Sequence, residues 1–272
     1  MEHRKIESAN GTTHYWISKN EDVSAKCIVF THGVTANHSM FEKQVEYFSG
    51  AYTVITWDVP LHGQSRPYKE FSFEETAKVL RAILQAEQIG KAVLVGMSLG
   101  GYPSQEFALR WPEMVLGFVA LDTTPYGLEY YSKFDRWCVG LVEPMAKCFP
   151  EKKLRKSMAG AVSRTEYSYE MMLKMLDPLS KAEICRQMGI AYAGFLKENR
   201  DAHFNFPVLI LLGEYDKTGK VAEYSRQWAK KEGYPLHIIK NAAHFSNGDN
   251  PDEVNKEIDS FIRGLGLNKR RQ

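Results

Sequence analysis

Short, almost uniformly apolar runs alternate with helical patterns along the first half of the chain, and this alternation restricts the fold more than any other feature. Strands as apolar as these are usually buried on both faces, as in a parallel sheet covered by helices. The runs span residues 27–30, 52–57, 92–95 and 115–121, and the helical patterns span residues 39–48, 73–85 and 102–111. This order predicts an α/β fold with a mostly parallel central sheet flanked by helices.

The N-terminus departs from this order. Residues 5–9 and 12–17 are extended patterns on either side of Asn10-Gly11. Asn-Gly between two extended segments is a strong signal for a tight antiparallel turn. We therefore expect the sheet to begin with a hairpin at its edge.

A long helical segment interrupts the strand pattern after Asp122, and only helical periodicity appears for about 75 residues. The pattern that resumes has strands at 208–212 and 236–240 and helices at 221–231 and 251–265. We predict a core domain of residues 1–124 and 201–272, with a helical cap subdomain of residues 125–200. The apolar residues expected to form mainly the core of this cap are Phe134, Trp137, Cys138, Leu141, Val142, Met145, Cys148, Phe149, Tyr167, Met171, Met175 and Leu176.

Composition excludes several classes of protein. The 272 residues are 44% hydrophobic and 25% charged, close to the average of globular proteins. Lys and Arg number 35 against 33 Asp and Glu, and this net charge of +2 argues against nucleic acid as a partner. No apolar run approaches the roughly 18 residues of a membrane span. The N-terminus lacks the apolar core of a secretory signal, which predicts a cytoplasmic protein.

The cysteines give no sign of a disulfide or a zinc site. Cys27, Cys138, Cys148 and Cys185 are far apart and none belongs to a C-x-x-C pair. Their apolar surroundings are typical of buried free thiols. The basic end, Lys269-Arg270-Arg271, is expected to be a solvated tail.

The peptide Gly96-Met97-Ser98-Leu99-Gly100 follows an apolar strand and precedes a helix. This is the context of a nucleophile elbow, in which small residues let strand and helix approach while the serine hydroxyl stays exposed. The rival interpretation is a phosphate-binding turn. A dinucleotide fingerprint needs glycine at Ser98, and a P-loop needs Gly-Lys before Ser or Thr, where this chain continues Gly101-Tyr102-Pro103. The pattern therefore favours Ser98 as a nucleophile.

A serine nucleophile needs a base, and histidine has the pKa that suits this task. His244 follows the predicted strand 236–240, at the edge of the sheet where α/β proteins place their sites. An acid must orient that histidine, and Asp216 follows the predicted strand 208–212. These positions predict a triad of Ser98, Asp216 and His244.

The sequence resembles the α/β-hydrolase fold serine hydrolases with a helical cap after the sixth strand, over nearly the whole chain. The matching pieces are Phe30-Thr31-His32-Gly33, residues 58–65, 96–100 and 213–216, and His244. The triad order Ser98, Asp216, His244 is also that of this family. The resemblance implies the α/β-hydrolase fold and an oxyanion hole formed by the backbone N–H groups of Val34 and Leu99.

Two departures from the family stand near these pieces. Leu61 occupies a position that is often glycine, and Lys217-Thr218-Gly219-Lys220 follows Asp216 where many relatives have an apolar residue. Asp122 directly follows the strand 115–121. In some variants of the fold the acid of the triad comes from this position, so Asp122 is the alternative acid. Chain order favours Asp216 over Asp122.

The resulting hypothesis is a serine hydrolase that cleaves carboxylic esters of a small, fairly apolar substrate, with no cofactor and no metal. His38, Trp137 and Met175 are the candidate substrate-binding residues. The same triad leaves open the hydrolysis of a C–C bond, a lactone or a thioester. A weakly catalytic ligand-binding or sensor protein is the alternative from another class. The sequence leaves the oligomeric state open.

Overall fold

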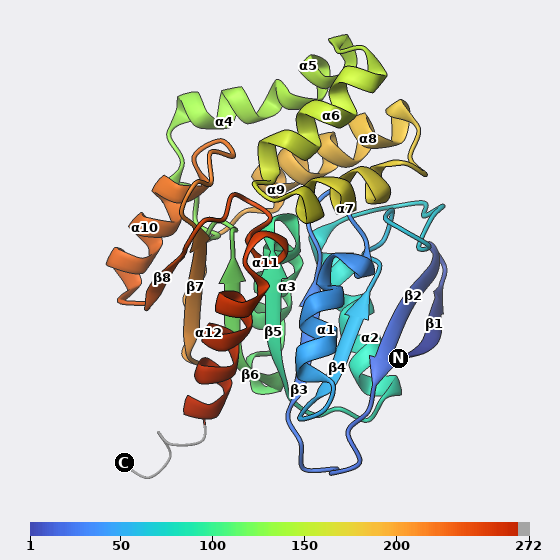
Figure 1. Ribbon diagram of the computed structural model, residues 1–272, viewed down its shortest axis with the longest axis vertical. Helices are drawn as coiled ribbons and strands as arrows, with labels where there is room; N and C mark the ends of the chain where they lie inside the picture. Colours follow the sequence, from blue (N-terminus) through green and yellow to red (C-terminus); the bar gives the residue numbers. More distant parts are fainter. Residues whose placement is uncertain (266–272) are drawn as a thin grey trace.

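A computed structural model describes residues 1–265 and contains one eight-stranded sheet with helices on both faces (Figure 1). The strands lie in the order β1-β2-β4-β3-β5-β6-β7-β8. Their bounds are β1 Glu2–Ser8, β2 Gly11–Ser18, β3 Cys27–Thr31, β4 Thr53–Trp57, β5 Ala92–Met97, β6 Val115–Leu121, β7 Val208–Gly213 and β8 Leu236–Ile239. The predicted tail at Lys269, Arg270 and Arg271 lies outside the described residues.

The pairing of the strands confirms the expected sheet. β1 and β2 form the antiparallel edge hairpin around Asn10-Gly11, and β2 is antiparallel to β4. All pairs from β4 to β8 are parallel. The chain adds β4 on one side of β3 and β5 on the other, so the crevice at their carboxyl ends is the switch point where α/β sheets bind ligands.

Both faces of the sheet are buried, as the apolar strands predict. Successive strand residues point to opposite faces, so Ile28 and Phe30 pack beneath α1 and α12, whereas Cys27 and Val29 pack on the opposite face. That opposite face is covered by α2, α3 and α10. The helix bounds are α1 Glu42–Phe48, α2 Phe73–Ala86, α3 Gly101–Arg110, α10 Val221–Glu232, α11 Ser246–Asp249 and α12 Pro251–Gly264.

Only helices occur between β6 and β7, in a stretch that the structure describes throughout. They gather beyond the carboxyl ends of the strands (Figure 1). Their bounds are α4 Lys133–Gly140, α5 Val142–Cys148, α6 Glu151–Val162, α7 Glu166–Leu176, α8 Lys181–Gly189, a π-helical turn at Ile190–Gly194, and α9 Phe195–Glu198. The division into a core of residues 1–124 and 201–272 and a cap of residues 125–200 stays a prediction.

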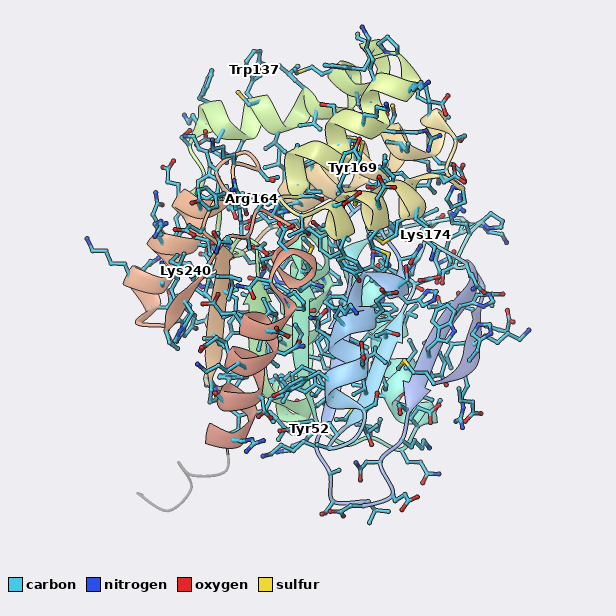
Figure 2. The ribbon with its side chains drawn as sticks, in the orientation of Figure 1. Tyr52, Trp137, Arg164, Tyr169, Lys174 and Lys240 are labelled. Carbon is cyan, nitrogen blue, oxygen red and sulfur yellow. The ribbon has the colours of Figure 1, made fainter. Side chains whose placement is uncertain are left out.

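Three of the twelve residues expected to form mainly the core of these helices are buried, and Met145, Cys148 and Phe149 are among those that are exposed. Met171, Met175 and Leu176 of α7 are buried as predicted. Phe134 and Trp137 are not, because they stand three residues apart on the outward side of α4 and are 68% and 62% exposed (Figure 2). Helical spacing shows that residues share a face, but it does not say which face meets the protein.

The cysteines are free, and two of them are buried. Cys27 and Cys185 lie in the core, whereas Cys148 is exposed and Cys138 is partly exposed. The prediction of four buried thiols is therefore wrong for the two cysteines on α4 and α5. Within residues 1–265, no helix is both long and apolar enough to cross a membrane.

Candidate active site

Ser98 lies at the sharp turn between β5 and α3. Its φ of +52° is a left-handed conformation that side-chain-bearing residues rarely adopt. Glycine is needed on both sides of it, because a Cβ at Gly96 would lie 2.6 Å from the Gly100 carbonyl oxygen, and a Cβ at Gly100 would lie 2.7 Å from the His32 carbonyl oxygen. Thr123 Oγ1 donates a hydrogen bond of 2.6 Å to the Ser98 carbonyl. The strained turn thus fixes Ser98 at the carboxyl end of the sheet.

His244 and Asp216 reach Ser98 from the loops that follow β8 and β7. His244 Nε2 lies 2.9 Å from Ser98 Oγ, and His244 Nδ1 lies 2.8 Å from Asp216 Oδ2. An ionised carboxylate only accepts, so Nδ1 carries the proton and donates it to Asp216. Nε2 is then free to accept the hydrogen bond from the Ser98 hydroxyl, which is the tautomer that a general base requires.

The charges in this chain of hydrogen bonds support each other. Burial alone would raise the pKa of Asp216, but the facing His244 and the Thr218 N–H, 2.8 Å from Asp216 Oδ1, lower it overall. Burial alone would lower the pKa of His244, but the Asp216 carboxylate raises it overall. Asp216 is therefore placed to stabilise the imidazolium that forms when His244 accepts a proton.

Asp122, the alternative acid, lies close to this chain but faces away from His244. Its Oδ1 accepts a hydrogen bond of 2.7 Å from Gly213 N, and its Oδ2 accepts the Ser246 hydroxyl and the Ser246 N–H. Burial, and then the nearby Asp216 charge, raise the pKa of Asp122. Asp122 thus ties β6 to the end of β7 and to Ser246 beyond β8, and of the two acids only Asp216 hydrogen-bonds the His244 ring in the described residues.

The segment after β3 brings Val34 beside Ser98. His32 orders this turn, because its Nε2 accepts the Val59 N–H at 3.0 Å and its Nδ1–H donates to the Gly33 carbonyl at 2.7 Å. Burial lowers the pKa of His32 to about 4, so the ring stays neutral in this role. Val34 lines the same cavity as Ser98, and Leu99 directly follows the serine. The oxyanion-hole role of their N–H groups stays a prediction.

The turn after β4 shows how the chain accommodates Leu61. Leu61 has a φ of +69°, so it keeps the left-handed conformation that the usual glycine would adopt without strain. Asp58 holds the turn by accepting the Gln64 N–H at 2.6 Å and the His38 N–H at 2.7 Å. This departure from the family therefore leaves the loop geometry in place.

Two cavities meet at Ser98, and both are lined by Ser98, Tyr192 and His244. The larger has a volume of about 570 Å³, which lies within the range of small-molecule sites. The smaller has about 120 Å³ and is lined on its far side by tyrosines, among them Tyr102 and Tyr131. The methionines that line the larger cavity are Met40, Met97, Met158, Met172 and Met188. A serine with its base in place thus opens onto an apolar chamber.

Comparisons with known proteins support the α/β-hydrolase fold. The family model described as "alpha/beta hydrolase fold" matches residues 26–137. A 2-(acetamidomethylene)succinate hydrolase from Mesorhizobium japonicum is 26% identical over 259 residues, which cover 90% of this chain and 91% of the relative. A 3-oxoadipate enol-lactonase from Acinetobacter baylyi is 23% identical over 246 residues, with 87% of this chain and 88% of the relative covered.

Solved structures show the same fold. A thermophilic esterase from Thermogutta terrifontis superposes with a TM-score of 0.74 at 19% identity, covering 97% of this chain and 99% of that one. A hydrolase from Pseudomonas aeruginosa gives a TM-score of 0.78 at 18% identity, covering 96% and 98%. The chain has the α/β-hydrolase fold. Its eight-stranded sheet and the helices between β6 and β7 are those of an α/β-hydrolase with additional helices after the sixth strand.

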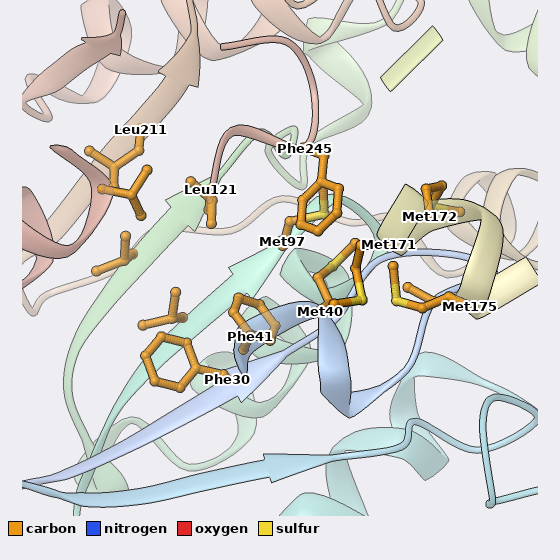
Figure 3. Close-up of a cluster of buried hydrophobic side chains, with 14 of the residues drawn as sticks. Phe30, Met40, Phe41, Met97, Leu121, Met171, Met172, Met175, Leu211 and Phe245 are labelled. Atoms are coloured by element: carbon orange, nitrogen blue, oxygen red, sulfur yellow. The ribbon is translucent and has the colours of Figure 1, made fainter. Parts of the chain in front are cut away.

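The three residues predicted to bind substrate do not line either of the two cavities at Ser98. The His38 ring is held between the Trp16 ring, with centroids 3.4 Å apart, and Asp58 Oδ1 at 2.8 Å. Trp137 points outward from α4 (Figure 2). Met175 is 2% exposed and packs in the apolar cluster with Met40 and Met171 (Figure 3). The prediction that these three residues line the substrate site is therefore corrected. His38 and Met175 pack against neighbouring side chains outside the two cavities, and Trp137 lies on the outer surface.

Other residues line the two cavities instead. Met172, on the same helix as Met175, lines the larger cavity, as does Arg164 in the link between α6 and α7. Tyr192 lies in the π-helical turn, an irregularity that often marks functional positions, and lines both cavities. The methionine stripe on α7 was the one available sequence signal, and it pointed to the right helix but the wrong residue. Within residues 1–265, no group of three or more His, Cys, Asp or Glu is arranged to bind a metal ion.

Proposed function

We propose that this protein is a serine hydrolase that cleaves carboxylic ester bonds of a small, fairly apolar substrate through an acyl-enzyme. One observation carries the proposal: Ser98 Oγ, His244 and Asp216 form a continuous chain of hydrogen bonds of 2.9 and 2.8 Å that opens onto a cavity. The nucleophile, the base and the group that orients the base are all within hydrogen-bond reach.

In the first half-reaction, Ser98 Oγ attacks the ester carbonyl while His244 Nε2 takes its proton. Asp216 stabilises the resulting imidazolium. The carbonyl oxygen becomes an oxyanion, for which the N–H groups of Val34 and Leu99 are the proposed donors. His244 then gives its proton to the leaving alcohol as the C–O bond breaks, and the acyl group stays on Ser98.

In the second half-reaction, His244 removes a proton from water, and the hydroxide that forms attacks the acyl carbon. The bond to Ser98 Oγ breaks, and the proton on His244 returns to the serine. The products are the free acid and the regenerated Ser98 hydroxyl. Every proton that moves in either half-reaction passes through His244 Nε2.

The two cavities support a substrate with one large and one small part on either side of the reacting carbonyl. The methionine-lined cavity of about 570 Å³ suits a fairly apolar part, and the one of about 120 Å³ suits a smaller group. Met158, Met172, Met188 and Tyr192 come from the helices between β6 and β7. We therefore assign substrate selection to the proposed cap of residues 125–200.

The same triad could open a lactone, which is an ester closed into a ring. One relative is named as an enol-lactonase, and this likeness makes cyclic esters part of any substrate screen. Thioester and C–C bond hydrolysis require the same nucleophile, so substrate tests must separate them from ester hydrolysis.

The test is a comparison of Ser98→Ala with Ser163→Ala on aryl esters of several acyl lengths. Ser163 lines the same larger cavity, but its Oγ has no partner among the described residues and therefore no base. Ser98→Ala should abolish hydrolysis with unchanged thermal unfolding, whereas Ser163→Ala should keep most of it. Lactones and thioesters are tested on the wild-type protein as well. If it hydrolyses none of the esters, lactones or thioesters, the weakly catalytic ligand-binding or sensor protein is supported instead.

A further inference from the structure

The larger cavity carries positive charge that the proposed ester chemistry does not use. Among the described residues that line it, Arg164 and Lys217 are cations and none is Asp or Glu. The smaller cavity is different, because it is lined by two acids, Asp122 and Asp135, as well as by the two cations Arg136 and Lys220, and Asp135 pairs with Lys220 at 2.9 Å. Of the two cavities that meet at Ser98, only the larger is therefore lined by cations with no carboxylate among its described lining residues.

Arg164 is fixed relative to the candidate triad. Its backbone N–H donates to Asp249 Oδ1 at 2.9 Å, and the neighbouring Val162 carbonyl accepts the Phe245 N–H at 2.7 Å. Phe245 directly follows His244. The link between α6 and α7 is thus bonded to the catalytic loop, and Arg164 lies at the junction between the two regions (Figure 2).

The Arg164 guanidinium lies over the Tyr215 ring, with Cζ 3.9 Å from the ring centre. Tyr215 and Lys217 flank Asp216 in the loop after β7, so the stack attaches Arg164 to the loop that also carries Lys217. Stacking restrains the planar group while its N–H edge stays free to donate. Asp249, the nearby acid, is occupied by the Arg164, Thr165 and Ala243 backbone amides rather than by the guanidinium.

We propose that the substrate carries a carboxylate on the part that occupies the larger cavity, and that Arg164 and Lys217 bind this carboxylate while the methionines contact the chain between it and the ester. The inference rests on the proposed function, because it takes Ser98 as the reacting residue. A guanidinium edge matches the two oxygens of a carboxylate, and a substrate carboxylate would supply the negative charge that the described lining of the larger cavity lacks.

The test uses pairs of substrates that differ only in charge. In one series the acyl chain of an ester ends in a carboxylate or in a neutral carboxamide. In a second series the same pair of end groups is carried by the alcohol, so that either part of the substrate can occupy the larger cavity. Chain length is varied in both series, and kcat/KM is measured for each pair at low and at high salt.

The wild-type protein should prefer the carboxylate member of the pair in one of the two series. Arg164→Gln should reduce this preference by about tenfold, mainly through KM, and Lys217→Gln by a smaller factor, since charge-assisted hydrogen bonds are among the stronger polar contacts. Arg164→Lys should restore part of the preference, because it keeps the charge without the planar stack. Added salt should weaken it in the wild type.

Lys174→Gln is the matched control, since Lys174 is exposed on α7 and lines neither cavity (Figure 2). It removes the same charge and should leave the preference unchanged. Calorimetry on Ser98→Ala, with and without Arg164→Gln, measures binding of the carboxylate-bearing product of the preferred series independently of turnover, and Arg164→Gln should weaken it.

The two proposals fail in different ways. If Ser98→Ala still hydrolyses both members of a pair, the proposed function is wrong. If Ser98→Ala is inactive but the wild type prefers the carboxamides or neither member, or if Arg164→Gln and Lys174→Gln have equal effects, the carboxylate site is wrong and the serine hydrolase stands.

Discussion

The loops at the carboxyl ends of the strands and the helices between β6 and β7 both contribute to the cavity, but they are held in different ways. Asp122 connects β6 to Gly213 and Ser246 with buried hydrogen bonds, and Ser98 sits in a turn whose glycines leave no free space. Across the cavity, hydrogen bonds from Thr165 and Ser168 to Asp249 hold the first turn of α7, whereas the middle of the helix packs against the core through the flexible methionines Met171, Met172 and Met175 (Figure 3).

The different ways of holding the two regions suit two different tasks, proton transfer at the strand ends and substrate binding at the helices. Hydrogen bonds and close backbone contacts fix atoms to a fraction of an ångström, which proton transfer between Ser98 and His244 requires. Methionine side chains have several rotatable bonds and a polarisable sulfur, so they fill irregular space and tolerate different shapes. We therefore expect changes at the strand ends to affect chemistry and changes in the helices to affect substrate choice.

The largest effect should come from Asp216. Asp216→Asn should lower kcat on the order of 10⁴-fold, because the amide favours the wrong imidazole tautomer without changing the shape of the site. Asp122→Asn should cost roughly tenfold, through displacement of the loops that it bonds. Measured kcat on one ester, with circular dichroism to confirm folding, ranks the two acids. The reverse ranking would transfer the acid to Asp122.

The pH profile is expected to show one ionisation on its acid side. His244 must be neutral to accept the Ser98 proton, and Asp216 raises its pKa above the ordinary 6.5. kcat/KM should therefore fall about tenfold per pH unit below a midpoint above 6.5 and reach a plateau on the alkaline side. Asp216→Asn should move the midpoint down, since burial then acts without the carboxylate. A rate that does not change between pH 5 and 8 would argue against a histidine base.

Two glycine substitutions compare the tolerance of the regions directly. Gly100→Ala places a methyl group against the Thr31 and His32 carbonyls, and should lower the free energy of unfolding by about 1–3 kcal/mol or more. Gly160→Ala in α6 meets only the Tyr169 ring at 4.0 Å, and should stabilise the protein by about 0.5–1 kcal/mol. Urea unfolding measures both. Equal destabilisation would show that the helices are packed as tightly as the elbow.

The sequence predicted the strand-end region well because parallel topology does most of the positioning. Once β5, β7 and β8 are parallel neighbours in one sheet, Ser98, Asp216 and His244 must follow strands that end at the same edge. No equivalent rule places side chains on the helices. Trp137 and Met175 both follow helical spacing, yet one faces outward and the other is buried behind the cavity wall. Arg164 lies in a link between helices, where no periodicity applies.

The smallest effect is expected from the cavity wall. Met188→Ala should change KM for long relative to short acyl esters a few-fold, because Met188 lines the larger cavity, and should leave the pH midpoint unchanged. Trp137→Ala should change neither, since its side chain is exposed on α4. Steady-state kinetics on a graded series of esters compares the two. A larger change of selectivity in Trp137→Ala would restore that residue to the substrate site.

The most direct test of the catalytic assignment is to locate a covalent label. A fluorophosphonate reacts with a serine only when a base activates the hydroxyl, and digestion followed by mass spectrometry identifies the modified residue. We predict a single adduct on Ser98, formed faster at pH 8 than at pH 5, and nearly lost in His244→Gln. An adduct on another serine, or equal labelling of Ser98 with and without His244, would contradict the account.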